Sequence, residues 1–167
     1  YFIRARARNT PDGLLSAFSN ELNVFTLANT PVSLSDDEVF LSSVTISWSA
    51  AGNPGNTPYE VTMSTDGFAA DLSTPVAFTD GLFAPTTTFL SLQAGTTYSF
   101  RVRALNGNAI PSPFSQALTT VTVPAPLSGL AATAQGTSSI TWTWNSSGAA
   151  ARYRVHSASS GAQLADT

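Results

Sequence analysis

The chain has 167 residues, 43% of them hydrophobic and only 10% charged, with a net charge of −3 at pH 7. This apolar content is sufficient for a packed core and argues against disorder, while the acidic balance argues against nucleic acid, which is bound through many cations. The absence of cysteine excludes disulfides and zinc–thiolate sites, and the lack of any apolar run of about 18 residues predicts no membrane insertion.

Short segments of alternating apolar and polar residues follow one another along the chain, separated by Gly, Pro and Asn. An alternation of period two predicts strands with one apolar and one polar face. Short strands at regular spacing, without helical periodicity, predict an all-β sandwich or barrel. The clearest segments are YFIRARARN (1–9), VTISW (44–48), YEVTM (59–63), TYSFRVRA (97–104), ITWTW (140–144) and YRVHS (153–157).

The chain also matches itself at an offset of about 96 residues, which indicates an internal repeat. Four separate segments share nearly the same offset, so chance similarity is a poor explanation. The matching pairs are 1–9 with 98–106, SAFSNEL (16–22) with SPFSQAL (112–118), SVTISW (43–48) with SITWTW (139–144), and YEV (59–61) with YRV (153–155).

The phase of this repeat predicts the domain organisation. Pro31 and Pro126 each precede a new series of strands and occupy linker positions. A complete unit therefore runs from 29 to 124. Residues 1–28 correspond to the last part of such a unit, and residues 125–167 correspond to the first part.

The complete unit carries an ordered set of motifs: a proline linker, a strand ending in Trp48, a Tyr-x-Val strand at Tyr59, and the pattern L-x-x-G-T-x-Y-x-F-R-V-R-A from Leu92 to Ala104. This order resembles tandem fibronectin type III domains of bacterial-type extracellular repeat proteins. The resemblance implies a seven-stranded, immunoglobulin-like β-sandwich. It assigns strands F and G to residues 1–28, and strands A, B, C and C′ to residues 125–167.

The resemblance and the alternation together predict the core. Tyr98 is expected to form a tyrosine corner through its hydroxyl group, and Leu92 to close the end of the sandwich between strands E and F. The expected core residues are Trp48, Tyr59, Val61, Leu92, Tyr98, Phe100 and Val102 in the complete unit, and Trp144 and Tyr153 in the last one.

The arginines fall on the polar faces of the predicted strands. Arg101 and Arg103 share one face of strand F, and Arg4 and Arg6 occupy the matching positions in the first unit. We expect this face to be solvated, with a carboxylate such as Glu60 opposite the arginines. The alternative is a polyanion-binding site.

No catalytic motif is present, so we expect no enzyme activity, catalytic residue, cofactor or metal. The only histidine, His156, is expected to be an exposed strand residue. The acidic run Asp36–Glu38 is interpreted as a solvated turn, with a calcium site as the alternative. Asn145 begins the sequence N-S-S, an acceptor pattern for N-glycosylation.

These features predict a non-catalytic structural segment of an extracellular or cell-surface repeat protein, serving as a spacer, adhesin stalk or filament building block. The expected partners are adjacent repeats or other copies of the chain, with cell-surface or carbohydrate ligands as a further class. One alternative is a set of accessory modules of a secreted polysaccharide-degrading enzyme. Another is a ligand-binding, receptor-like tandem whose partner site is carried by Trp142, Phe2 or the loops.

The incomplete end units have two interpretations. Either the chain is one part of a longer tandem array, or the C-terminal part of one subunit completes the N-terminal part of the next. The second interpretation is head-to-tail strand complementation, a heterologous contact that leads to an open filament.

Overall fold

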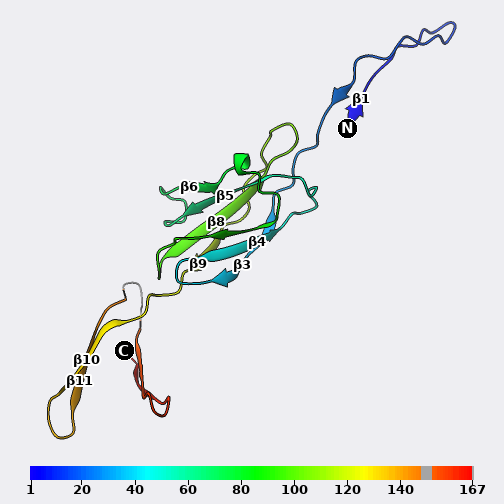
Figure 1. Cartoon of the computed structure of the whole chain (residues 1–167). Coiled ribbons are helices and arrows are strands. Elements are labelled where there is room, and N and C mark those ends of the chain that lie inside the picture. Colours follow the sequence, from blue (N-terminus) through cyan, green and yellow to red (C-terminus); the bar gives the residue numbers. More distant parts are fainter. Residues whose placement is uncertain (148–151, 167) are drawn as a thin grey trace.

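The computed structural model describes residues 1–147 and 152–166. It contains one β-sandwich, formed within residues 29–124, from whose opposite ends the first and last segments of the chain extend as hairpins (Figure 1). The strands of this sandwich lie between Val32 and Val121.

The sandwich consists of two antiparallel sheets of three and four strands. Strand order follows the scheme A-B-E in one sheet and C′-C-F-G in the other, so the prediction of an all-β sandwich is confirmed. A single 3-10 turn, η1 (Phe78–Asp80), precedes the fifth of these seven strands. The first sheet contains β3 (Val32–Val39), β4 (Val44–Ser49) and β7 (Thr86–Phe89). The second contains β6 (Ser73–Val76), β5 (Tyr59–Ser64), β8 (Thr97–Ala104) and β9 (Leu118–Val121).

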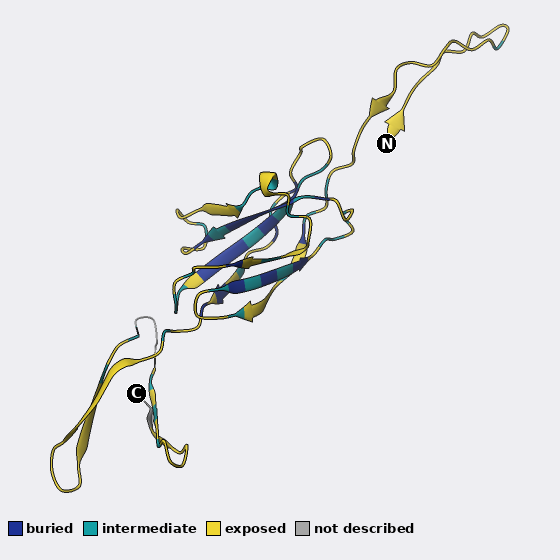
Figure 2. Ribbon diagram, viewed as in Figure 1, coloured by how far each residue is buried: buried dark blue, intermediate teal, exposed yellow. Residues whose placement is uncertain are grey.

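The core lies between the two sheets (Figure 2). Phe89 and Phe100 stack with their ring centres 4.8 Å apart, and Trp48 meets Tyr59 edge to face at 5.4 Å. Every buried apolar residue of this core falls between 44 and 104, and Ala28, the last residue of the first segment, packs against it. The buried residues are Val44, Ile46, Trp48, Tyr59, Val61, Phe89, Tyr98, Phe100, Val102 and Ala104.

The hairpins outside the sandwich are largely exposed. They are formed by β1 (Phe2–Ile3) with β2 (Leu22–Asn23), β10 (Ser128–Ala134) with β11 (Ile140–Asn145), and β12 (Arg154–His156) with β13 (Gln163–Asp166).

The first hairpin differs from what its sequence predicts. We expected Tyr1, Ile3, Ala5 and Ala7 to form a buried strand face, but Tyr1 is 76% exposed and regular pairing is limited to two residues of β1. The physical reason is that residues 1–28 supply only the last two strands of a repeat. No facing sheet covers their apolar side in this structure, although the apolar pattern itself is present.

Candidate functional site

The outer face of β8 carries a ladder of arginine and phenylalanine side chains. The guanidinium carbon of Arg101 lies 4.1 Å from the ring centre of Phe114 and 4.2 Å from that of Phe68. The corresponding atom of Arg103 lies 4.6 Å from the Phe114 ring centre and 5.4 Å from that of Phe78. A cation over an aromatic face is attracted by the ring quadrupole. The expectation of a solvated arginine face is therefore wrong, because three phenyl rings cover the guanidinium groups, but the expected carboxylate of Glu60 does lie opposite Arg103.

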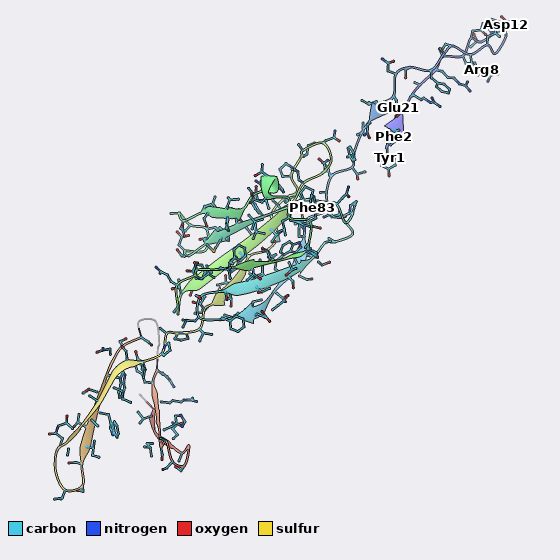
Figure 3. All side chains as sticks on the ribbon, viewed as in Figure 1. Tyr1, Phe2, Arg8, Asp12, Glu21 and Phe83 are labelled. Atoms are coloured by element: carbon cyan, nitrogen blue, oxygen red, sulfur yellow. The ribbon has the colours of Figure 1, made fainter. Side chains whose placement is uncertain are left out.

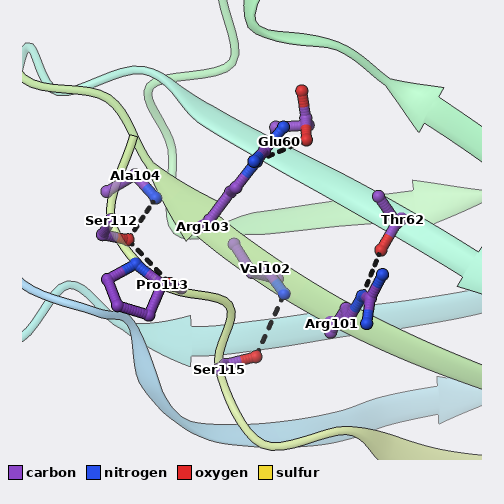
Figure 4. A network of polar contacts seen from close by, with 9 residues as sticks. All are labelled: Glu60, Thr62, Arg101, Val102, Arg103, Ala104, Ser112, Pro113 and Ser115. Atoms are coloured by element: carbon purple, nitrogen blue, oxygen red, sulfur yellow. Dashed lines mark hydrogen bonds and ion pairs between the residues drawn. The ribbon is translucent and has the colours of Figure 1, made fainter. Parts of the chain in front are cut away.

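The neighbouring strand β5 supplies polar partners for the same arginines (Figure 4). Arg103 forms an ion pair with Glu60, with Nε 2.6 Å from Oε1, and Arg101 Nε donates a hydrogen bond of 3.1 Å to Thr62 Oγ1. Glu60 is only 9% exposed and Thr62 only 2%, so both faces of β5 are covered. Because each guanidinium is already bound by rings and oxygens of the domain, the geometry gives no support to the polyanion alternative.

Two serines on either side of Phe114 hold its segment against β8. Ser112 and Ser115 donate backbone hydrogen bonds to the carbonyl groups of Ala104 and Val102, at 2.7 and 2.8 Å. In return, their hydroxyl oxygens each accept a bond of 3.0 Å from the backbone amide of the same strand residue. The segment between β8 and β9 is thus fastened to β8 by both backbone and side-chain hydrogen bonds. Figure 4 shows the side-chain bonds.

The same arrangement recurs in the first hairpin. Arg4 and Arg6 place their guanidinium carbons 4.3 and 4.7 Å from the ring centre of Phe18. The hydroxyl oxygens of Ser16 and Ser19 accept hydrogen bonds of 2.9 and 3.0 Å from backbone amides of the arginine segment. Two segments that match in sequence therefore also match in local geometry.

The predicted tyrosine corner is present. The Tyr98 hydroxyl oxygen accepts a hydrogen bond of 2.9 Å from the backbone amide of Gln93, and Leu92, half-buried, packs against the core. The contacts of Tyr98 and Leu92 close the end of the sandwich from which the chain leaves. Burial raises the pKa of the other core tyrosine, Tyr59.

The expected core residues of the last unit meet each other. The rings of Trp144 and Tyr153 lie edge to face with centres 5.6 Å apart, and both residues are half-buried. The Tyr153 hydroxyl group lies 2.9 Å from Ser146 Oγ, and this hydrogen bond lowers the pKa of Tyr153. The pair repeats the edge-to-face contact of Trp48 and Tyr59.

The acidic run Asp36–Glu38 lies within strand β3, so its interpretation as a turn is wrong. Its carboxylates have separate partners: Asp36 accepts a hydrogen bond of 2.7 Å from Thr120 Oγ1, and Asp37 accepts one of 2.9 Å from Ser47 Oγ. Among residues 1–147 and 152–166, no three acidic or histidine side chains gather in a way that could hold a metal ion. The calcium alternative thus gains no support here.

Asn145 and His156 lie on the last two hairpins. Asn145 ends β11 and is exposed, with its Nδ2 3.5 Å from Ser128 Oγ. His156 is also exposed, as expected, and its Nδ1 lies 3.1 Å from the carbonyl oxygen of Gly161. Neither residue adjoins a cluster of chemically active side chains in the described part of the chain.

The loop after β5 is organised by Asp66. Its carboxylate accepts hydrogen bonds from the Ser64 hydroxyl group and from the backbone amides of Ala69, Ala70 and Asp71, at 2.8 to 3.0 Å. These donors favour the ionised form and lower the pKa of Asp66 to about 2, with the Asp71 amide as the largest cause.

Sequence reasoning missed a joint at which the entering linker is fastened to the sandwich. In the loop after β8, Asn106 Nδ2 donates 3.0 Å to the carbonyl oxygen of Thr26, and Asn108 Oδ1 accepts 3.1 Å from the amide of Phe25. Gly107 lies so close to Phe25 that an added Cβ would come within 2.6 Å of its ring. Only glycine therefore fits at this position without movement of the ring.

A second pair of contacts fixes the linker to the loop after β4. Asn29 and Asn53 form reciprocal bonds of 2.8 Å, in which the amide of Asn29 donates to Asn53 Oδ1 and Asn53 Nδ2 donates to the Asn29 carbonyl oxygen. The only sequence signal for this joint is the concentration of asparagine in the loops GNPGN (52–56) and NGN (106–108).

Between the linker and these two loops lies a cavity of about 370 Å³. Its walls include Phe25 and Leu27 of the linker, Pro54 of the loop after β4, Phe83 of the segment between η1 and β7, and Leu105 directly after β8. Phe83 is at the end of the sandwich that faces the first hairpin (Figure 3). The cavity is lined by apolar and uncharged polar residues alone.

The fold and these contacts define a β-sandwich of the fibronectin type III kind. The family model for the fibronectin type III domain matches residues 30–121, more than half of the chain. The chain therefore belongs to the fibronectin type III family. No curated protein was found to match it, and no helix in the described part is long and apolar enough to cross a membrane.

Solved structures of low sequence identity share the fold. The fibronectin type III domain of human fibronectin type III domain containing protein 3 is 19% identical over 60% of this chain and 90% of that one, with a TM-score of 0.51. Domains A168–A170 of titin are 24% identical, with a TM-score of 0.51, and the match covers 65% of this chain and 37% of that one. At these identities the likeness shows the fold alone.

Proposed function

We propose that the chain is a non-catalytic structural segment of an extracellular or cell-surface repeat protein, in which fibronectin type III domains act as a spacer, adhesin stalk or filament building block. The observation that carries this proposal is recurrence. The arginine–phenylalanine–serine arrangement of Arg101 and Phe114 is repeated by Arg4 and Phe18, and the Trp48–Tyr59 contact is repeated by Trp144 and Tyr153.

Residues 1–28 and 125–167 are then parts of neighbouring repeats, with 29–124 as the complete domain between them. Exposed apolar side chains support this assignment, because Tyr1, Ile3 and Trp142 lie on faces that a repeat of this family buries. In this proposal the remaining strands of each neighbouring repeat belong to the same polypeptide. Completion by a second copy of the chain would cover the same faces, and deletion of residues 1–28 would then abolish polymers.

The composition fits an extracellular setting. Serine and threonine account for 44 of the 167 residues, lysine is absent, and the surface carries little net charge. A neutral, hydroxyl-rich surface suits a module that separates other domains in space without binding polyanions. Partners would accordingly be adjacent repeats, with cell-surface or carbohydrate ligands recognised elsewhere in the array.

Antibodies raised against residues 29–124 test the location. Labelling of intact source cells, or of the surrounding medium, is the expected result. Labelling only after the cells are made permeable would contradict an extracellular role. A catalytic or carbohydrate-binding domain in the same polypeptide would favour the alternative of accessory modules in a polysaccharide-degrading enzyme.

A further inference from the structure

The cavity at the entry joint has uncharged walls, in which apolar side chains stand beside polar ones. Phe25 and Leu27 of the linker form part of these walls, and the asparagine contacts described above hold that linker in place. Phe83, on the opposite side, remains 49% exposed. A preformed, uncharged cavity beside a fixed linker is suited to a segment of the domain to which that linker is attached.

The opposite end of the same domain offers such a segment. Where the chain leaves the sandwich, the amide of Val123 donates 3.1 Å to the carbonyl oxygen of Phe40, and the Val123 carbonyl accepts 3.1 Å from Gly95. The exit strand is thus held against the loop between β3 and β4. At the tip of that loop, Phe40 and Leu41 are 56% and 41% exposed.

The repeat register brings these two features together. Leu27 corresponds to Val123 at the offset of 96 residues. In a preceding repeat, the loop equivalent to that of Phe40 would therefore bond to Leu27, which is itself a wall of the cavity. The loop tip and the cavity would then lie side by side, without any movement of the linker.

We propose that the cavity is the docking site for the loop between the first two strands of the preceding repeat, with the counterpart of Phe40-Leu41 as its occupant. This inference rests on the proposed tandem array. The loop tip is apolar, and the cavity combines apolar with uncharged polar residues. The linker keeps the two surfaces at high effective concentration, so docking needs little intrinsic affinity. The consequence is a stiff joint, in which consecutive domains move as one body.

A two-domain protein tests the docking. It consists of residues 29–120 followed directly by residues 25–124, a junction that keeps both the repeat register and the native entry linker. Each copy contains all of the buried apolar residues of the core, from Val44 to Ala104. NMR relaxation measures the rotational correlation time of each domain, and we expect both domains to share one value, with nuclear Overhauser contacts between Leu41 of the first copy and Phe83 of the second.

Leu41→Ser in the first copy should remove these contacts and lower the correlation time of each domain towards that of a single domain. Ile110→Ser in the first copy is the matched control, because Ile110 is a similarly exposed loop residue (47%) at the end that has no neighbour. Independent tumbling in the parent protein, or no effect of Leu41→Ser, would overturn the docking but leave the array intact. A second copy that failed to fold would overturn the modular array and the docking together.

Discussion

Arg103 and Glu60 face each other across β8 and β5, with Nε 2.6 Å from Oε1 in a directly opposed cross-strand pair. The pair is largely shielded from water, since the side chain of Glu60 is 12% exposed and that of Arg103 is 30% exposed. Shielding strengthens the attraction but also raises the desolvation cost. The net contribution of the pair to stability is therefore the difference between these two effects.

A double-mutant cycle of Glu60→Gln and Arg103→Gln measures this pair. We expect each single variant to be destabilised, and a coupling free energy of about 1 kcal/mol, because the pair is largely shielded from water but not fully buried. Denaturant unfolding of the full chain gives the four stabilities. Additive effects of the two substitutions would show that the two side chains do not stabilise each other.

The aromatic ladder gives a second prediction. Phe114→Ala should lower the free energy of unfolding by about 2 to 3 kcal/mol, because it removes apolar burial and two cation–π contacts. Phe114→Leu keeps most of the apolar volume but lacks the ring, so it isolates the aromatic contribution, expected to be about 1 kcal/mol. If Phe114→Leu were as stable as the parent, the ladder would be hydrophobic packing only.

The tyrosine corner at Tyr98 leads to a third prediction. Tyr98→Phe leaves the backbone amide of Gln93 without its acceptor, and an unsatisfied amide near the core costs about 1 to 3 kcal/mol. Tyr153→Phe removes a hydroxyl group on the exposed last hairpin and serves as the matched control. Thermal unfolding of the sandwich should respond to the first substitution alone. Equal melting temperatures for both variants would argue that water replaces the lost bond.

Asp66 gives a prediction of pH dependence. Its pKa falls from 3.8 to about 2 on folding, so the folded state binds the proton less tightly than the unfolded state. Its contribution to stability is therefore complete above about pH 4 and is lost as the pH falls towards 2.

Unfolding measured between pH 2 and 5 checks this. Asp66→Asn should flatten the dependence of stability on pH in that window, whereas Asp12→Asn, in the first hairpin, should leave it unchanged. Parallel curves for the parent and Asp66→Asn would mean that other carboxylates cause the acid sensitivity.

The sequence predicts the sandwich well because its evidence is local. Strands β4, β5 and β8 alternate cleanly, and the segment from Leu92 to Ala104 contains both the turn and the tyrosine that closes the core. The covered arginine face could not be predicted in the same way. Phe68, Phe78 and Phe114 come from three separate segments between strands, so the residues near Arg101 in the sequence do not predict these contacts.

Two further differences have similar causes. Asp36 and Asp37 have low strand propensity, but pairing of β3 with β4 and the hydroxyl partners of these carboxylates override it. The entry joint depends on asparagines whose partners are backbone groups more than twenty residues away, as for Asn29 and Asn53. Side chain to backbone contacts over such separations leave no periodic pattern in the sequence.

The central claim is that this chain belongs to an array of fibronectin type III domains that serves as a structural spacer. Electron microscopy of the native polypeptide, purified from its source, tests this most directly. We predict slender rods or fibres in which similar domains follow one another in line. A compact particle, in which a single domain of this kind is attached to a larger globular body, would contradict the account.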